Sequence, residues 1–267
     1  MHVANLMAEL EMDVWDCLAA VPDPELDEPI TDMNFVERVT VSEDQRVRVD
    51  FRLPTYWCSP NFAFLMAFGI RTEVLALPWV RGVEVRLRDH CLGEEVNEGV
   101  NSGRPFHEIF AENCGGAVLG EVSEKFLAKA FDRRQEVMLL ALEAQGLAAA
   151  EIVAMRLGAL KRTRFTGETE QRQLPRYLDI LARRGLARDD ADPAFPTWEG
   201  GRIAPEQLRA HLGRLRSTRI SMEFSGALCR GLAETRYKEV QIGPEGPTLV
   251  DFIAGRVPPR DAPETRR

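Results

Sequence analysis

The sequence has no long apolar run, few histidines and no closely spaced cysteine pair. No apolar segment approaches the roughly 20 residues that a helix needs to cross a bilayer, which argues against a membrane-spanning protein. The 5 cysteines are an odd number, lie far apart and form no CxxC pair, so reduced thiols in a cytoplasm are expected rather than a disulfide framework. The N-terminal segment has early acidic residues and no basic region before an apolar stretch, so no signal peptide is expected.

Charge is distributed unevenly along the 267 residues, whose formal net charge is −8. Residues 1–100 contain 19 acidic and 8 basic residues, a net charge of −11. Residues 101–267 contain 23 acidic and 26 basic residues, a net charge of +3. The two halves therefore differ electrostatically, and the chain is long enough for two ordinary domains.

The N-terminal third alternates between helical and strand-like patterns. Apolar residues at helical spacing predict a helix over 3–20, and three prolines within 21–29 end it. Alternating apolar and polar residues predict strands at 35–41, 46–53 and 82–88. Between the last two strands, Ser59-Pro60 resembles the start of a helix that continues over 61–77. The expected order is α-β-β-α-β, in a domain over residues 1–95.

The remainder of the chain is expected to be mostly helical, which makes the whole an α+β protein. Residues 89–118 contain glycines and mixed polar residues and are interpreted as the connection between domains. A helical domain is predicted over 119–256, and residues 257–267 are expected to form a disordered tail. The helices of this domain are predicted at 119–145, 149–161, 174–185, 205–216 and 217–238.

An ordered set of short motifs runs through the first domain. The motifs are Asp23-Pro24-Glu25-Leu26, Ile30-Thr31-Asp32-Met33-Asn34-Phe35-Val36, Leu53-Pro54-Thr55-Tyr56-Trp57-Cys58, and Leu77-Pro78 before Val83 and Val85. Over residues 8–90 this set resembles the SufT/PaaD-like iron–sulfur assembly family, which includes the eukaryotic cytosolic iron–sulfur targeting factor. The family usually has glycine at the place of Asn34, and asparagine is the next-best residue for a left-handed turn. The proline that follows the family's cysteine is displaced by one residue, to Pro60.

The resemblance implies an accessory factor that builds or delivers iron–sulfur clusters, rather than an enzyme. Iron or a cluster would be bound transiently and passed to a client metalloenzyme, such as a di-iron monooxygenase or its reductase. Other assembly proteins would be further partners. The longer form resembles versions that accompany bacterial di-iron monooxygenases, and the expected location is the cytoplasm. The oligomeric state stays open.

Cys58 is the expected working residue, as a reactive thiol and as a metal ligand. It lies between the end of a strand and the start of a helix, where the helix dipole and free N–H groups lower the pKa of a thiol. The thiolate is the form that binds iron. The alternative is a small buried packing residue. Asp32 would either share the metal with Cys58 or cap its own turn.

His90 and Cys91 are further candidate metal ligands, directly after the third strand. A hairpin followed by a parallel crossover would bring Asp32, Cys58, His90 and Cys91 to the same edge of the sheet. Asp89-His90-Cys91 would otherwise be a solvated strand end. A rival hypothesis makes the protein a thiol enzyme, in which His90 is the base for Cys58.

Arginines are frequent over residues 156–219. This stretch permits an alternative function, a nucleic-acid-binding regulator with a winged-helix arrangement. Because the chain is acidic and no basic aromatic motif is present, a solvated face or a docking surface for an acidic client is expected instead. Neither a membrane nor nucleic acid is expected as a partner on that interpretation.

Overall fold

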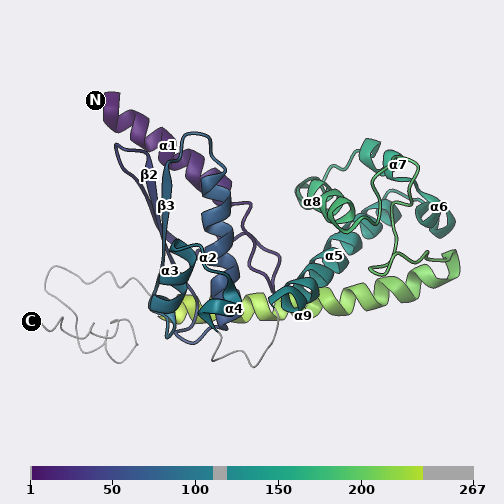
Figure 1. The fold of residues 1–267 in the computed structure, drawn as a ribbon. Helices are drawn as coiled ribbons and strands as arrows, with labels where there is room; N and C mark the ends of the chain where they lie inside the picture. The colour runs from purple at the N-terminus through teal and green to yellow at the C-terminus, as the bar shows by residue number, and fades with distance from the viewer. Residues whose placement is uncertain (1, 111–118, 237–267) are drawn as a thin grey trace, which may run out of the picture. The chain divides into compact units, whose positions relative to one another are not determined.

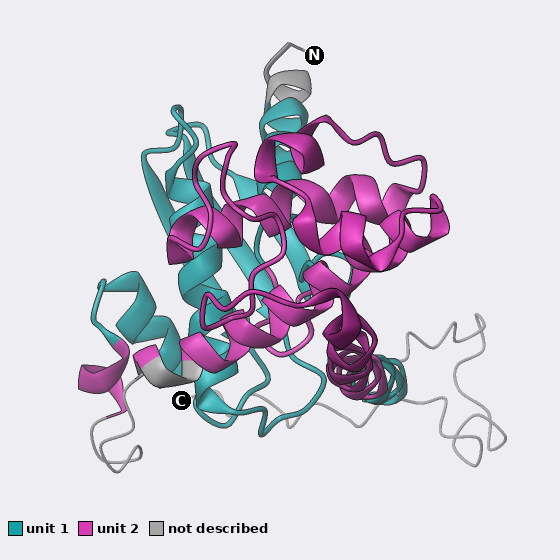
Figure 2. Ribbon diagram, turned by 90° about the vertical axis from the view of Figure 1, so that its right-hand side faces the viewer, with its two compact units in different colours: residues 1–21, 29–105, 226–267 teal, residues 22–28, 106–225 magenta. Residues whose placement is uncertain are grey.

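The structure is a computed structural model that describes residues 2–110 and 119–236 (Figure 1). The chain divides into two compact units (Figure 2). Unit 1 comprises residues 1–21, 29–105 and 226–267, and unit 2 comprises residues 22–28 and 106–225. The tail predicted over 257–267 lies outside the described residues. No helix among the described residues is long and apolar enough to cross a membrane.

Unit 1 contains a three-stranded sheet whose strands follow the chain in the order β1-β2-β3. Its elements are α1 (His2–Leu18), β1 (Val36–Val41), β2 (Arg46–Arg52), α2 (Pro60–Leu75), β3 (Gly82–Arg88) and α3 (Gly93–Asn101). Strands β1 and β2 form an antiparallel hairpin, and β2 pairs with β3 in parallel. The α+β class and the predicted order α-β-β-α-β are therefore confirmed.

The alternation of side chains along β2 explains which face of the sheet is covered. Val47, Val49 and Phe51 are buried, whereas Arg46 and Arg48 are exposed; Asp50, between Val49 and Phe51, is buried too. Helix α1 packs against β1 and helix α2 packs against β3. The helices thus cover the apolar face, and burial of aliphatic side chains there is the main stabilising term of this unit.

Asn34 marks the tight turn that leads into β1. Its φ angle is 56°, in the left-handed region that few residues other than glycine adopt readily. Phe35 follows directly, and its N–H donates to the carbonyl of Ile30 at 3.0 Å. Asparagine therefore does occupy the turn in which the family usually has glycine.

Helix α3 lies within the segment that was predicted to be only a connection, and it covers the free edge of β3. The side-chain amide of Asn97 bonds both backbone groups of Leu87, at 2.7 and 3.0 Å. Asn101 does the same with Val85, at 2.9 and 2.8 Å. Two asparagines one helical turn apart thus take the place of a fourth strand and leave this edge less open to other chains.

Unit 2 is helical. The helix predicted at 174–185 begins earlier, at Glu168, and the helices differ from the prediction in further places. Its elements are α4 (Phe106–Ile109), α5 (Leu119–Ala144), α6 (Ala149–Ala154), α7 (Leu157–Arg162), α8 (Glu168–Arg184), the 3-10 helix η1 (Pro205–Gln207) and α9 (Leu208–Arg236). The helix predicted over 149–161 is interrupted because Met155 and Arg156 are extended. The two helices predicted from 205 onward are one continuous helix, α9, whose residues from 226 belong to unit 1.

The loop of residues 22–28, which carries the first motif, belongs to unit 2. Asp23 shapes it, because its carboxylate accepts the N–H groups of Glu25 and Leu26 at 2.8 and 2.9 Å. The carboxylate of Asp27 is almost fully buried and accepts two bonds from Arg134 of α5, at 2.5 and 2.8 Å. Arg176 of α8 adds a third bond at 2.9 Å. A buried ion pair therefore ties the motif loop to two helices of this unit.

Candidate functional site

The carboxyl ends of β2 and β3 meet at one edge of the sheet in unit 1. Their parallel pairing sets Arg52 beside Arg88, so the loops that follow both strands leave from the same edge. The start of β1 reaches this edge too, because the N–H of Arg52 donates to the carbonyl of Phe35 at 2.8 Å. The loops that carry Asp32, Cys58 and His90 are therefore attached at a common edge, where ligands gather in open α/β sheets.

Cys58 lies just before helix α2. It precedes the N-cap residue Ser59 and carries a half-buried, reduced thiol. The carbonyl of Ser59 accepts the N–H groups of Phe62 and Ala63 at 3.0 and 3.1 Å, which begins the helix. Proline at the first helical position fits because its missing N–H has no partner within the helix there. The thiol consequently lies near the positive end of a 16-residue helix.

His90 holds the backbone of Cys58 in place. Its Nε2 lies 2.8 Å from the carbonyl oxygen of Cys58, and its Nδ1 accepts the N–H of Leu92 at 3.1 Å. A carbonyl oxygen only accepts, so Nε2 carries the proton and the imidazole is neutral. Burial lowers the pKa of His90, which keeps the ring neutral. In this conformation neither ring nitrogen is available to a metal ion or to the thiol.

Cys91 belongs to the same pair of loops. Its N–H donates to the carbonyl of Tyr56 at 2.8 Å, and its thiol is exposed and reduced. Two hydrogen bonds therefore join the loop after β3 to the loop before α2: one from Cys91 to Tyr56 and one from His90 to Cys58. The two loops therefore form one hydrogen-bonded structure that carries two thiols.

Arg236, the last residue of α9, also reaches this edge within unit 1. Its guanidinium donates to the carboxylate of Asp89 at 2.5 Å and to the Asp89 carbonyl at 3.2 Å. The same group lies 5.9 Å from the centre of the Tyr56 ring, within the range of a cation–π contact. No sequence pattern pointed to Arg236, because it lies 147 residues from Asp89.

Asp32 is exposed in the turn that precedes β1. Backbone bonds hold this turn, from Met33 N–H to the carbonyl of Pro29 at 3.1 Å and from Asn34 N–H to that of Thr31 at 3.0 Å. The turn does not depend on the Asp32 carboxylate for these bonds. That Asp32 shares a metal ion with Cys58 stays a prediction.

Comparison with known proteins identifies the domain that carries this edge. The family model described as "Iron-sulfur cluster assembly protein" matches residues 11–87. A relative from Methanocaldococcus jannaschii, Uncharacterized protein MJ1129, is 30% identical over 86 residues, which are 32% of this chain and 88% of that protein. The chain belongs to the iron–sulfur cluster assembly protein family. The match extends from α1 to β3 and includes Cys58, whereas most of the chain after β3 lies outside it.

Membership in the iron–sulfur cluster assembly family gives the chain a general role in cluster assembly and implies contact with other assembly proteins. Among residues 2–110 and 119–236, no group of three or more His, Cys, Asp or Glu side chains is arranged to hold a metal ion. The thiols of Cys58 and Cys91 are the soft metal ligands at this edge of the sheet.

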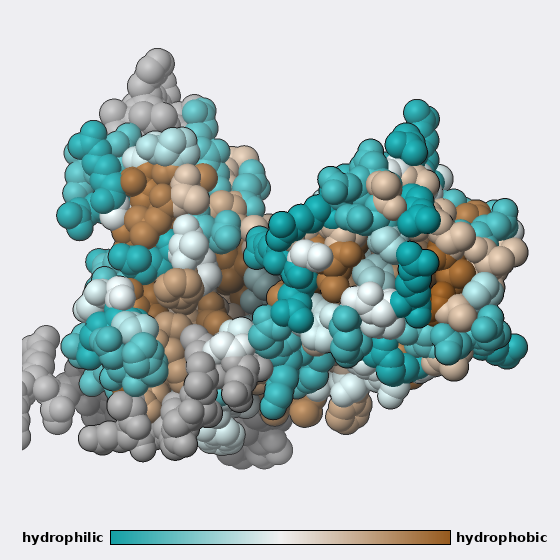
Figure 3. All heavy atoms as spheres, turned by 45° about the vertical axis from the view of Figure 1, so that its right-hand side comes forward, coloured by the Kyte–Doolittle hydropathy of each residue, from teal (hydrophilic) through white to brown (hydrophobic). Residues whose placement is uncertain are grey.

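Two aromatic side chains precede Cys58 and reach the surface. Trp57 is 75% exposed and Tyr56 is 45% exposed. Apolar side chains reach the surface elsewhere too, as one face of the molecule shows in Figure 3. Large exposed aromatic residues are typical of protein-binding surfaces, where tryptophan and tyrosine supply much of the binding energy. Tyr56 and Trp57 thus place exposed aromatic surface next to Cys58 in the chain.

Proposed function

We propose that the chain accepts iron or an iron–sulfur cluster at the thiol of Cys58 and passes it to a client metalloenzyme. The observation that carries this proposal is the position of Cys58: it lies in the family domain, at the start of α2, in a loop fixed by His90 and Cys91. The hydrogen bonds from His90 and Cys91 hold the backbone of this loop, so they restrict the positions that the Cys58 thiol can take.

The chemistry of transfer follows from the small number of ligands at this edge. Iron binding displaces the proton of the thiol, and the positive end of α2 favours the resulting thiolate. Asp32 and Cys91 are the candidate second donors, while His90 would have to give up a hydrogen bond to become one. A cargo held by so few ligands passes readily to a client that supplies a complete set.

The client that the family resemblance favours is a multicomponent oxygenase, such as a di-iron monooxygenase or its reductase. Unit 2 and the rest of the chain beyond the family match are available to recognise such a client. Anaerobic co-purification tests this function directly, with iron and acid-labile sulfide measured beside the bound proteins. The wild-type chain should retain client and metal together, and Cys58→Ser should retain the client without the metal. Equal metal content in the two preparations would count against Cys58.

A second function is supported by the arrangement of α6, α7 and α8 in unit 2. The segment between α6 and α7 pairs with a returning segment, through Leu157 N–H to the Asp192 carbonyl at 2.9 Å and Ala194 N–H to the Met155 carbonyl at 3.0 Å. A short turn, residues 163–167, then joins α7 to α8. Helices in this order with a small antiparallel pairing are typical of winged-helix DNA-binding modules.

Basic side chains at that turn could contact the phosphates of DNA, and replacing them tests nucleic-acid binding. Arg162 and Arg164 are exposed, and the structure shows no ion pair of theirs within the described residues. Retention of the chain on duplex DNA should fall steeply with salt concentration if this function holds, and Arg162→Glu with Arg164→Glu should abolish it. Absence of DNA retention at low salt would leave cluster delivery as the function of the chain.

A further inference from the structure

The sheet face that the helices leave uncovered collects most of the positive charge of the N-terminal region. Residues 1–100 contain 8 arginines and no lysine, with a net charge of −11. Six of these arginines lie on the three strands: Arg38, Arg46, Arg48, Arg52, Arg86 and Arg88. Most basic residues of this acidic region therefore lie on the three-stranded sheet.

The strand register shows that these arginines share one face. Arg38, Asp50 and Arg86 form one row across the sheet, and Thr40, Arg48 and Glu84 form the next. Arg46 is paired with Gly82, and Arg52 with Arg88. Because side chains alternate between the faces of a strand, all of these residues point away from the apolar face of Val47 and Val49.

Acidic residues neutralise this face only in part. Glu37 pairs with Arg52, and Asp50 lies in the row between Arg38 and Arg86. Glu84 is shared by two arginines, Arg48 at 2.8 Å and Arg86 at 2.7 Å. Arg46 pairs with Asp44 at 3.2 Å, in a contact where both side chains are more than 60% exposed. Such exposed pairs contribute little stability, so an incoming carboxylate can replace Glu84 or Asp44 at small cost. Arg38 and Arg88 are exposed, and no ion pair of theirs appears within the described residues.

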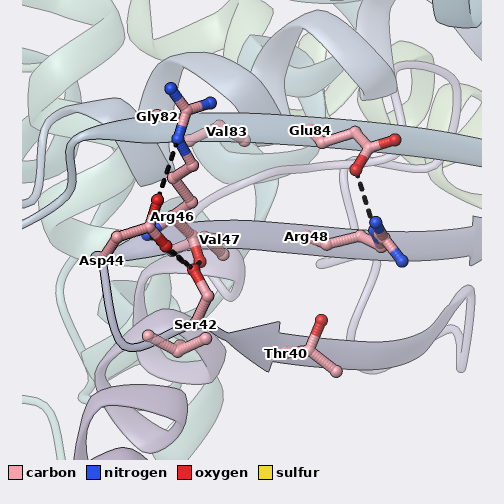
Figure 4. A pocket seen from close by; sticks show the side chains of 10 residues that line it. Thr40, Ser42, Asp44, Arg46, Val47, Arg48, Gly82, Val83 and Glu84 are labelled. Atoms are coloured by element: carbon pink, nitrogen blue, oxygen red, sulfur yellow. Dashed lines mark hydrogen bonds and ion pairs between the residues drawn. The ribbon is translucent and has the colours of Figure 1, made fainter.

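A groove of about 480 Å³ opens on this face at the hairpin end of the sheet (Figure 4). Its lining includes Thr40, Ser42, Arg46, Arg48, Gly82 and Glu84. Figure 4 shows the side chains of Arg46 and Arg48 on β2, with Gly82 and Glu84 on the neighbouring strand β3. Hydroxyl groups and guanidinium groups thus line the same depression.

We propose that this face binds an extended acidic segment of a partner protein. Alternate residues of an extended chain are about 6.8 Å apart, so carboxylates at every second position match the spacing of Arg46 and Arg48 along β2. The strands contribute no aromatic residue other than the buried Phe51, so the face has no platform for stacked bases. Residues 1–100 carry a net charge of −11, so the positive charge of this face is local and suits a short acidic segment. This surface does not depend on the thiol of Cys58.

Fluorescence anisotropy with a labelled peptide of about ten residues, alternating glutamate and serine, tests the proposal on the full chain. The wild-type chain should bind the peptide at low ionic strength, and more weakly as NaCl rises from roughly 20 to roughly 200 mM. Replacing Arg38 and Arg48 together by glutamine should weaken binding roughly tenfold. Arg183→Gln removes an exposed arginine of α8 in unit 2, and it should leave the affinity unchanged.

Thr40→Glu provides a second variant that keeps every arginine. Thr40 is exposed on β1 opposite Arg48, so a carboxylate there should compete with the peptide and weaken its binding. Circular dichroism checks that each variant is folded. Unchanged affinity in both the arginine variant and Thr40→Glu would overturn the proposal. Tighter binding of a single-stranded DNA oligonucleotide of similar length would also overturn it, in favour of a polyphosphate ligand.

Discussion

Asp27 provides the sharpest prediction about stability, because its carboxylate is the counter-charge of a buried arginine. The Asp27 side chain is 2% exposed and that of Arg134 is 9% exposed, while Arg176 is 23% exposed. Asp27→Asn keeps the shape of the side chain and removes its charge. Asparagine also tolerates the left-handed backbone at this position, where φ is 54°. The substitution therefore isolates the electrostatic contribution.

The expected loss follows from the burial of Arg134. Breaking a buried ion pair by removing one partner costs roughly 3–5 kcal/mol, because the remaining charge is left without compensation. Arg176 can regain water, and the asparagine oxygen still accepts one hydrogen bond, so about 3 kcal/mol is expected for Asp27→Asn. Asp27→Ala should cost more, since alanine also strains the left-handed backbone.

Urea unfolding followed by circular dichroism measures this effect, since unit 2 is helical. Arg134→Met in the Asp27→Asn background removes the uncompensated charge and should restore most of the lost stability. A free energy of unfolding for Asp27→Asn within about 0.5 kcal/mol of wild type would show that the buried Asp27 carboxylate does not stabilise the fold. An isolated fragment of residues 106–225 should be destabilised in the same way, because it lacks Asp27.

Three further predictions concern other parts of the chain. Burial raises the pKa of Asp23 to about 6, so its protonated form is favoured in the folded state. The contribution of Asp23 to stability should therefore fall as pH rises from about 4 to about 6, and Asp23→Asn should remove this fall from urea midpoints measured across that range. Asn97→Ala should expose the edge of β3, and hydrogen exchange of the Leu87 amide should accelerate; an unchanged rate would contradict the edge-covering role. Burial raises the pKa of Cys17 to about 11, so iodoacetamide should alkylate Cys58 before Cys17 at neutral pH, and the reverse order would contradict a reactive Cys58.

Local patterns predicted the fold of unit 1. Alternation of apolar and polar residues predicted β2 to within one residue, and Ser59-Pro60 predicted the start of α2. Asn34 was predicted to adopt a left-handed turn and does so. Each of these features depends on residues that are close in sequence, which is why a single sequence sufficed.

Features that depend on distant residues were not predictable. Helix α3 has only two large apolar side chains, Val96 and Val100, and the pairing of Asn97 and Asn101 with the backbone of β3 positions it along the strand. The interruption between α6 and α7 depends on pairing with residues 192–194. Arg236 reaches Asp89 across 147 residues of sequence. Contacts between residues that are far apart in the chain produce no periodic pattern in the sequence.

The candidate site was predicted in part. The common edge follows from the hairpin and the parallel crossover, which the sequence pattern indicated. The engagement of both nitrogens of His90 could not be predicted, because it depends on the backbone positions of Cys58 and Leu92. That engagement weakens the hypothesis of a thiol enzyme, because a base for Cys58 needs an available ring nitrogen.

We propose that the thiol of Cys58 works in the delivery of iron or clusters to a client. The most direct test is to produce a di-iron monooxygenase and its reductase together with this chain, and to measure iron and acid-labile sulfide per client molecule. With the wild-type chain and with Cys17→Ser, which removes a thiol of α1, the client should carry its full metal complement. With Cys58→Ser the client should be made but lack metal. A client with full iron and sulfide content beside Cys58→Ser would contradict the account.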